Sequence, residues 1–319
     1  YHGPPQLTLS RAFTEWVPDP AMITFTVVLG LCYVAGVCRV RRRGGEWRTG
    51  HVVEFCGLGL GFLVIAVMSW TGVYQNILFY ARATQTVLLV LLVPLFLAMG
   101  KPITLFIENF PAAGARVERA VRSLPLKVIT FPLVTSLLLA GVPMSMYFTN
   151  WYTATFHSGT ARELTYLALM ATGYLFFWTM LRADPVPKEY PYGVGLWITA
   201  AEMVGDAFFG LAVIADENVI ARPSYHAAGW PYGPSLATSQ VIGGGIIWVL
   251  GDAVGLPFLA VQFIRMMRAD KSEAAAVDAE LDVREAEAPG DAGEDTERPW
   301  WESDPRFTGR FSRRRPGGT

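Results

Sequence analysis

Seven long runs of apolar residues dominate the first 269 positions of the chain. Each run is long enough to cross a hydrocarbon core about 30 Å thick as a helix, which needs about 20 residues. The runs are continuous, whereas outer-membrane strands alternate apolar and polar residues over about ten positions. The pattern predicts an all-α polytopic membrane protein built as a seven-transmembrane-helix bundle. The expected spans are 20–38, 52–71, 77–99, 128–148, 163–181, 194–215 and 236–264.

The formal net charge of the chain is −1, but the charged residues are distributed unevenly along it. Residues 270–319 hold 13 acids and 8 bases, so charged residues make up only about 12% of positions 1–269, against roughly 25% in soluble domains. This deficit excludes a soluble globular protein, and the balance of charge gives no sign of nucleic-acid binding. We expect an outer N-terminal segment (1–19), a seven-helix membrane domain (20–269) and, beyond a short helical extension, a disordered charged cytoplasmic tail (270–319). The first residue is Tyr1 and not Met, which indicates a processed protein or part of a longer one.

The bases near the ends of the spans predict the orientation, because cytoplasmic loops collect Lys and Arg. Fourteen bases follow the first, third, fifth and seventh spans, whereas the opposite side carries three. We therefore expect the N-terminus outside, the C-terminus in the cytoplasm and the chain in the cell membrane. The fourteen are Arg39, Arg41, Arg42, Arg43, Arg48, Lys101, Arg116, Arg119, Arg122, Lys127, Arg182, Lys188, Arg265 and Arg268; the three are Arg11, Arg162 and Arg222.

Aromatic residues gather at the predicted outer edges of the spans, where amphipathic rings prefer the lipid headgroup region. This position favours membrane anchors over ligand-binding residues. The residues are Trp16, Trp70, Tyr74, Trp151, Tyr152, Trp230 and Tyr232.

Ionisable residues inside the spans are the strongest functional candidates, because a charge in hydrocarbon costs about 2.5–3.5 kcal/mol even on lenient scales. Four qualify: Arg82 in the third span, Glu202 and Asp206 in the sixth, and Asp252 in the seventh. Glu202 and Asp206 are four residues apart and share one helix face. We expect an internal ion pair between Arg82 and Asp206, with Glu202 nearby. In the alternative, Arg82 snorkels to the outer interface while Asp206 lines a small wet pocket.

Methionines are the remaining candidates for chemistry, since thioethers select Cu(I). Met144 and Met146 approach the outer end of the fourth span, and Met203 lies in the sixth. Met in a helix also fills irregular core space, and none of the four histidines has a helical partner. No Walker A, HExxH, GxSxG or Rossmann glycine pattern occurs, which favours a protein that is not an enzyme.

A set of short stretches, in order along nearly all of residues 4–273, resembles the CtaG family of cytochrome c oxidase assembly proteins in its actinobacterial form. The resemblance implies an integral membrane protein that matures the copper centre of the oxidase, with Cu(I) as ligand and oxidase subunits as partners. The stretches are Pro4–Leu9, Trp16–Pro20, Leu88–Pro102, Gly173–Trp178 with Asp184 and Pro185, Ala207–Gly210, Gln240–Trp248 with Gly251 and Asp252, and Arg268–Glu273.

The chain departs from the family pattern where that pattern implies copper ligands. The family has His-x-x-x-His at the positions held here by Arg82 and Thr86, histidines in the fifth span, and a His at Asp206. Three hypotheses remain: copper handling through Met144, Met146 and Met203, a divergent metal-free scaffold or partner of the respiratory complex, and a proton-coupled transporter. The replacement of histidines by Arg82 and Asp206 favours the scaffold over copper handling. No internal repeat of the kind found in transporters is visible.

Overall fold

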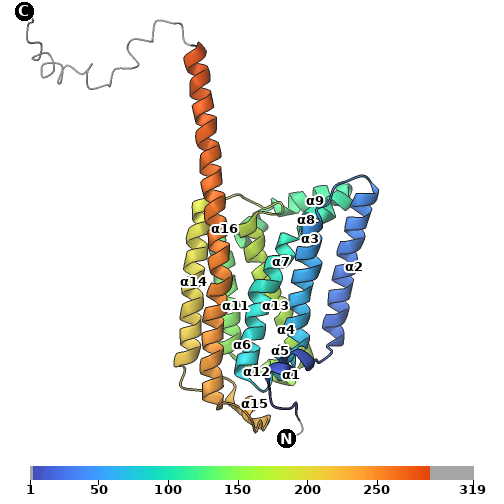
Figure 1. Ribbon diagram of the computed structural model, residues 1–319, viewed down its shortest axis with the longest axis vertical. Helices are drawn as coiled ribbons and strands as arrows, with labels where there is room; N and C mark the ends of the chain where they lie inside the picture. The colour runs from blue at the N-terminus through green and yellow to red at the C-terminus, as the bar shows by residue number, and fades with distance from the viewer. Residues whose placement is uncertain (1–2, 288–319) are drawn as a thin grey trace, which may run out of the picture. The chain divides into compact units, whose positions relative to one another are not determined.

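The computed structural model describes residues 3–287. The chain divides into two compact units, Tyr1–Phe263 and Ile264–Thr319. The first unit is a bundle of helices that run roughly side by side (Figure 1). No strand occurs among the described residues. The predicted all-α polytopic membrane fold is therefore confirmed.

Each predicted span falls on one or more helices of the structure, and several spans are built from consecutive short helices. Two of them contain a π-helical segment, η1 in the second span and η2 in the third. The spans and the helices that flank them are α1 (Leu9–Thr14), α2 (Pro20–Arg42), α3 (Thr49–Val52), η1 (Val53–Gly59), α4 (Leu60–Met68), α5 (Trp70–Tyr74), α6 (Phe79–Val87), η2 (Leu88–Leu92), α7 (Val93–Met99), α8 (Pro102–Asn109), α9 (Pro111–Val121), α10 (Leu124–Ile129), α11 (Pro132–Phe148), α12 (Asn150–His157), α13 (Gly159–Leu181), α14 (Tyr192–Ala215), α15 (Arg222–Ala227) and α16 (Leu236–Glu287).

The fourth span differs from the expected segment 128–148. Phe131 is extended and α11 begins at Pro132, which fits proline's preference for the first turn of a helix. Its 17 residues span only about 26 Å at 1.5 Å per residue. After Thr149 the chain bends by 70° into α12. By length and composition six helices of the described chain can cross a membrane, and a seventh if α11 and α12 form one broken span.

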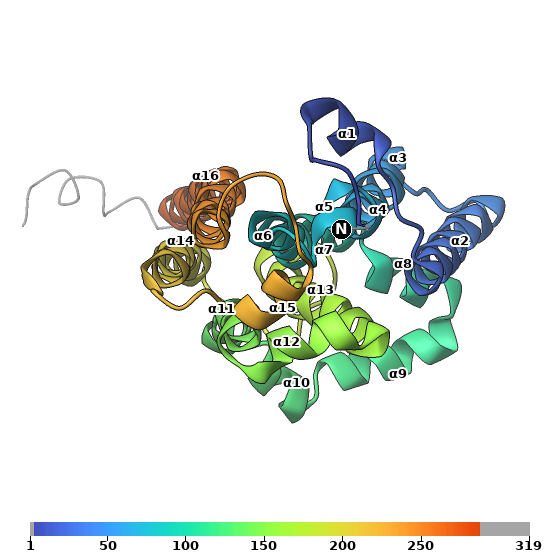
Figure 2. The ribbon, with the colours of Figure 1, turned by 90° about the horizontal axis from the view of Figure 1, so that it is seen from below.

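The centre of the bundle is formed by α13 together with the continuous helix α6–η2–α7. These spans are the most buried, whereas α2, α14 and α16 lie at the periphery; Figure 2 shows the same arrangement along the bundle axis. Gly173 of α13 faces η2 so closely that a Cβ atom there would lie 2.0 Å from the carbonyl oxygen of Val90. Only glycine permits this approach of two backbones.

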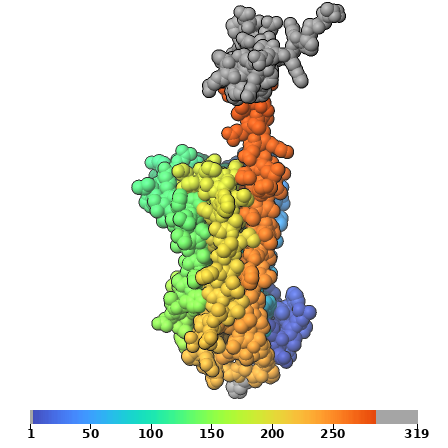
Figure 3. All heavy atoms as spheres, turned by 90° about the vertical axis from the view of Figure 1, so that its left-hand side faces the viewer, coloured from blue at the N-terminus to red at the C-terminus, as the bar shows by residue number. Residues whose placement is uncertain are grey.

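The peripheral helices α14 and α16 pack along a seam of glycines and lie side by side on one face of the first unit (Figure 3). A Cβ atom at Gly210 would lie 2.6 Å from the carbonyl oxygen of Gly244, and one at Gly244 would lie 2.7 Å from that of Gly210. Further along the seam, Gly251 faces Asp206 and Gly255 faces Met203. Small residues at such positions are typical of close helix contacts in membranes.

The loops rich in bases gather at one end of the first unit, together with α8 and α9, and the N-terminal segment, α5, α12 and α15 lie at the other (Figure 1). At the base-rich end, Asp184 accepts hydrogen bonds from the backbone N–H groups of Ile103 and Thr104 and from the Thr104 hydroxyl. Burial raises the pKa of Asp184, although these hydrogen bonds act in the opposite direction. The carboxylate joins the loop after α13 to the start of α8. Which end faces the cytoplasm stays a prediction.

In the second unit, α16 continues to Glu287. Its last turns are rich in Ala and Glu, which favour helix, and Arg284 donates to Glu280 one turn earlier at 2.8 Å. The tail predicted for 270–319 therefore begins with an ordered helix through residue 287. The remainder of that predicted tail, 288–319, lies outside the described residues.

Two of the predicted membrane anchors are instead buried inside the first unit. Tyr74 and Tyr152 are fully buried, and the Tyr74 hydroxyl donates to the carbonyl oxygen of Pro5 at 2.7 Å. The anchor prediction is wrong for both, because their rings pack against the bundle and not toward lipid. Trp16 and Tyr232 are exposed, as an anchor requires.

Candidate functional site

The first polar centre of the bundle is Arg82, whose side chain is only 1% exposed. It projects from α6, directly after the break between α5 and α6. The start of α6 is fixed from a distant helix, since the Ser239 hydroxyl accepts a hydrogen bond from the Phe79 N–H at 3.1 Å. This anchoring places the guanidinium among α5, α12 and α13.

Neutral groups surround the guanidinium. Arg82 Nη1 donates to Gln75 Oε1 at 2.9 Å, and Nη2 donates to the Thr155 hydroxyl at 2.5 Å. The carbon between them lies 5.4 Å from the centre of the Tyr152 ring, within the range of a cation–π interaction. Gln75 Oε1 also accepts from the Tyr166 hydroxyl at 2.7 Å. These five residues, Gln75, Arg82, Tyr152, Thr155 and Tyr166, are called the Arg82 cluster below.

A belt of aromatic hydroxyls continues the Arg82 cluster toward the middle of the bundle. The Thr86 hydroxyl donates to the Arg82 carbonyl and lies 3.2 Å from the Tyr147 hydroxyl. The hydroxyls of Tyr152 and Tyr225 are 2.6 Å apart. Arg82 and Thr86 hold the two positions at which the family resemblance implies histidines. The side chains of both residues already form hydrogen bonds within the protein.

The predicted ion pair between Arg82 and Asp206 is wrong. Arg82 forms no ion pair with Asp206 in the described chain; ion pairs do join His51 to Glu54, Arg162 to Asp19 and Arg284 to Glu280. The snorkelling alternative is also wrong for Arg82, since a side chain that is 1% exposed does not reach the interface. Amide, hydroxyl and ring groups stabilise the charge in place of a carboxylate.

The second polar centre is formed by Glu202 and Asp206 on α14. Glu202 is 7% exposed; its Oε2 accepts a hydrogen bond from the Ser136 hydroxyl of α11, whereas its Oε1 is buried without a hydrogen-bond partner in the described chain. Below, these two carboxylates and Ser136 are called the acid centre.

Two small cavities adjoin the acid centre, each of about 20 Å³, and Asp206 lines both. One cavity also contacts Glu202 and Met203, and the other contacts Thr86. A space of this size holds about one water molecule. Asp206 therefore lies beside a small pocket, as the alternative to the ion pair expected, while Asp252 lines neither cavity.

The three candidate methionines do not share one environment. Met144 and Met146 are two residues apart on α11, so their side chains point about 200° apart. Met146 is fully buried, and Met144 is half-buried. Met203 lines the cavity beside Glu202. In the part of the chain that the structure describes, no group of three or more His, Cys, Asp or Glu side chains is arranged to hold a metal ion.

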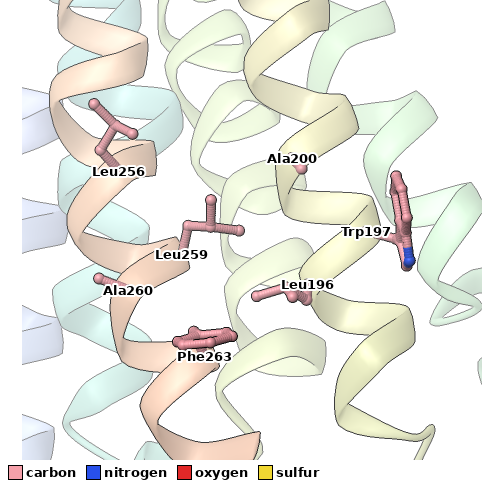
Figure 4. Close-up of a pocket in the computed structure, with 7 residues that line it drawn as sticks. All are labelled: Leu196, Trp197, Ala200, Leu256, Leu259, Ala260 and Phe263. Carbon is pink, nitrogen blue, oxygen red and sulfur yellow. The ribbon is translucent and has the colours of Figure 1, made fainter.

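A larger pocket of about 490 Å³ lies between α14 and α16, and its lining is apolar (Figure 4). Leu259 and Phe263 point from α16 toward α14, and Leu196 points from α14 toward α16. Ala200 and Ala260 leave the space between the helices open. Apart from the indole N–H of Trp197, the lining side chains carry no polar group, so the pocket offers no acid, base or metal ligand.

Sequence reasoning missed the neutral members of both centres. Gln75, Thr155 and Ser136 were not singled out, although a buried amide or hydroxyl in a membrane bundle needs a partner as a charge does. The available signal was Gln75, a polar residue between two apolar runs and seven residues before Arg82. Thr155 lies 73 positions after Arg82, and nothing in the sequence links the two.

The apolar helices and the buried polar centres define a multi-pass helical membrane protein. Within this class, the chain belongs to the cytochrome c oxidase caa3 assembly factor family (CtaG), whose model matches residues 31–269. The family resemblance of the sequence is thereby confirmed.

Curated relatives occur in mycobacteria. An uncharacterized protein of Mycobacterium leprae is 29% identical over 269 residues, which cover 82% of this chain and 40% of the relative. Uncharacterized proteins of Mycobacterium bovis and Mycobacterium tuberculosis are each 27% identical over 290 residues, covering 88% of this chain and 44% of the relative. The chain thus spans about two fifths of the length of these relatives. No solved structure matches it.

Proposed function

We propose that this protein is a non-catalytic factor of the cell membrane that assists assembly of a caa3-type cytochrome c oxidase as a scaffold, without holding copper inside its bundle. Family membership supports the assembly role. The surroundings of Arg82 are the observation that favours a scaffold over copper handling.

The argument from Arg82 is electrostatic. A guanidinium stays protonated in proteins, so the bundle carries a fixed positive charge at a position where the family resemblance implies a metal ligand. This charge has no carboxylate partner in the described chain, and it repels a second cation in a medium of low dielectric constant. Arg82 and Thr86 are already engaged with protein groups. The residues present therefore do not fit a copper ion at this place.

Copper handling through methionines is the competing function, and Met203 is the residue that favours it. Its side chain lines the cavity that also contacts Glu202 and Asp206. Cu(I) prefers soft thioether ligands, but Met144 and Met146 point in different directions on α11. A single thioether beside two carboxylates is a poor Cu(I) site.

Metal analysis of the purified protein after exposure to Cu(I) separates the two functions. The scaffold predicts less than about 0.1 Cu(I) per chain after desalting, and the same value for the triple variant Met144→Leu, Met146→Leu and Met203→Leu. As a positive control, Arg82→His, Thr86→His and Asp206→His together should raise Cu(I) retention, because they place imidazoles at the positions where the resemblance implies them. About one Cu(I) per wild-type chain, lost in the triple methionine variant, would contradict the scaffold.

A cellular test addresses the assembly role itself. Deletion of the gene should lower the amount of assembled oxidase, and copper added to the medium should fail to restore it if the protein acts as a scaffold. The triple methionine variant should restore assembly as well as the wild type does. Rescue of the deletion by copper alone would instead support copper delivery.

A further inference from the structure

A cleft of about 430 Å³ opens at the end of the bundle that carries the N-terminal segment. Its walls come from the segment before α2, from α4, α5 and the turn after α5, and from the first two turns of α13. The cleft adjoins the Arg82 cluster through Gln75, which belongs to both, and it shares no lining residue with the acid centre. Its other polar side chains are those of Asp19, Asn76, Arg162 and Glu163.

Arg162 supplies the positive charge of the cleft and keeps hydrogen-bonding capacity. Its Nη2 lies 4.0 Å from Asp19 Oδ2, at the outer limit of an ion pair. Its Nε is buried and has no partner within residues 3–287. A buried guanidinium N–H that lacks an acceptor costs free energy, so an anionic group in the cleft would stabilise the protein at this point.

Three residues with acceptor oxygens, Asp19, Asn76 and Glu163, line the same cleft. Asn76 Oδ1 is buried without a partner in the described chain. Asp19 uses Oδ1 to cap α2 through the Met22 N–H at 3.1 Å, which leaves Oδ2 with the distant contact to Arg162. Glu163 lines the cleft one position after Arg162. The cleft contains two carboxylates and one guanidinium. A complementary ligand therefore has a cationic donor for the carboxylates as well as an anionic group for the guanidinium.

The position of the cleft relative to the membrane indicates the kind of ligand. α2 begins at Pro20 and α13 at Gly159, and both cross the membrane by length and composition. Asp19 and Arg162 thus lie at the ends of spans, where phospholipid headgroups lie. Phosphate is the preferred partner of a guanidinium, and a primary ammonium offers N–H donors to carboxylates and an amide oxygen.

We propose that this cleft binds the headgroup of phosphatidylethanolamine, with its phosphate on Arg162 and its primary ammonium among Asp19, Asn76 and Glu163. The proposal does not depend on the assembly function. Phosphatidylcholine, whose quaternary ammonium has no N–H donor, should bind poorly. Phosphatidylglycerol has no cation for the two carboxylates.

Native mass spectrometry of the full chain, released from mixed micelles with equal mole fractions of the three lipids, tests the specificity. We expect one tightly held phosphatidylethanolamine, retained about tenfold more than phosphatidylcholine, the factor that corresponds to loss of one charge-assisted hydrogen bond. Equal retention of the two lipids would overturn the proposal.

Substitutions test which residues bind the phosphate and which bind the ammonium of the headgroup. Arg162→Gln should lower retention of phosphatidylethanolamine about tenfold, whereas Arg222→Gln, a base outside the cleft lining, should leave it unchanged. Glu163→Lys should shift the preference from phosphatidylethanolamine to phosphatidylglycerol, a change of specificity that loss of folding cannot produce. Unchanged lipid preference in both cleft variants, with normal thermal unfolding, would refute the assignment.

Discussion

The Arg82 cluster and the acid centre hold charged groups inside one bundle in opposite ways. The guanidinium of Arg82 donates to an amide and a hydroxyl and lies over an aromatic ring. Glu202, by contrast, has one hydroxyl donor and one oxygen without a partner, and small cavities adjoin it. The cluster is closed and rigidly specified, whereas the acid centre keeps an open position. A buried charge can therefore be stabilised by neutral dipoles alone, provided that enough of them converge.

The largest expected effect on the free energy of unfolding comes from replacing Arg82, the central residue of the Arg82 cluster. Arg82→Ala leaves a cavity and removes two hydrogen bonds and the ring contact, so we expect a loss of about 3–5 kcal/mol in the free energy of unfolding. Arg82→Met keeps the volume. The former partners retain other hydrogen bonds, Gln75 with Tyr166 and Thr155 with the Tyr152 carbonyl, so Arg82→Met should stay within about 1.5 kcal/mol of the wild type.

Unfolding by denaturant in detergent micelles measures both variants. A loss as large for Arg82→Met as for Arg82→Ala would show that the positive charge itself, and not the filled volume, stabilises the bundle.

A second prediction concerns the glycine seam that forms the wall of the acid centre. Gly210→Ala would place a methyl group 2.6 Å from the Gly244 carbonyl and 2.9 Å from the Trp248 Cβ, so α14 and α16 must separate. We expect a loss of about 1–3 kcal/mol. Gly205→Ala on the same helix meets open space and should be neutral or stabilising, by up to about 1 kcal/mol, because alanine favours helix. Equal thermal unfolding temperatures of the two variants would contradict the tight seam.

The sequence predicts the spans far better than it predicts their contacts. Apolar runs locate the membrane helices because burial in lipid acts on each segment separately. The error at the fourth span has a local cause: Pro132 begins α11, and the bend after Phe148 sends the chain into α12. A hydropathy run does not record such breaks.

The candidate site was only partly predictable, for a different reason. Arg82, Glu202 and Asp206 stand out because charges are rare in apolar runs. Their partners depend on which helix faces meet, and the sequence offered Asp206 as an opposite charge, whereas the fold brings Gln75 and Thr155 to Arg82. Charge complementarity therefore predicts the partner of a buried charged residue poorly when neutral polar residues can also reach that residue.

Because one oxygen of Glu202 lacks a hydrogen-bond partner in the described chain, we expect the protein to tolerate substitution of Glu202. Glu202→Gln keeps an oxygen for the Ser136 hydroxyl and replaces a largely buried carboxyl group by a neutral amide of nearly the same shape. We expect the free energy of unfolding to change by no more than about 1 kcal/mol, since one oxygen of the carboxyl group already lacks a partner in the described chain. Thermal unfolding of Glu202→Gln beside Glu217→Gln, an exposed carboxylate two residues beyond the end of the same helix, provides the comparison. A loss above about 3 kcal/mol would mean that Glu202 has a partner as strong as those of Arg82.

The smallest expected effect is the most direct test that the two centres are independent. A double-mutant cycle of Arg82→Gln with Asp206→Asn should give a coupling energy below about 0.5 kcal/mol, as for sites without a shared partner. The cycle of Arg82→Gln with Gln75→Leu serves as the positive control, because these side chains hydrogen-bond directly at 2.9 Å and contacting residues couple by about 0.5–3 kcal/mol. Unfolding free energies of the single and double variants give both values. Coupling of Arg82 with Asp206 as strong as that with Gln75 would restore the ion pair and remove the distinction between a closed cluster and an open acid centre.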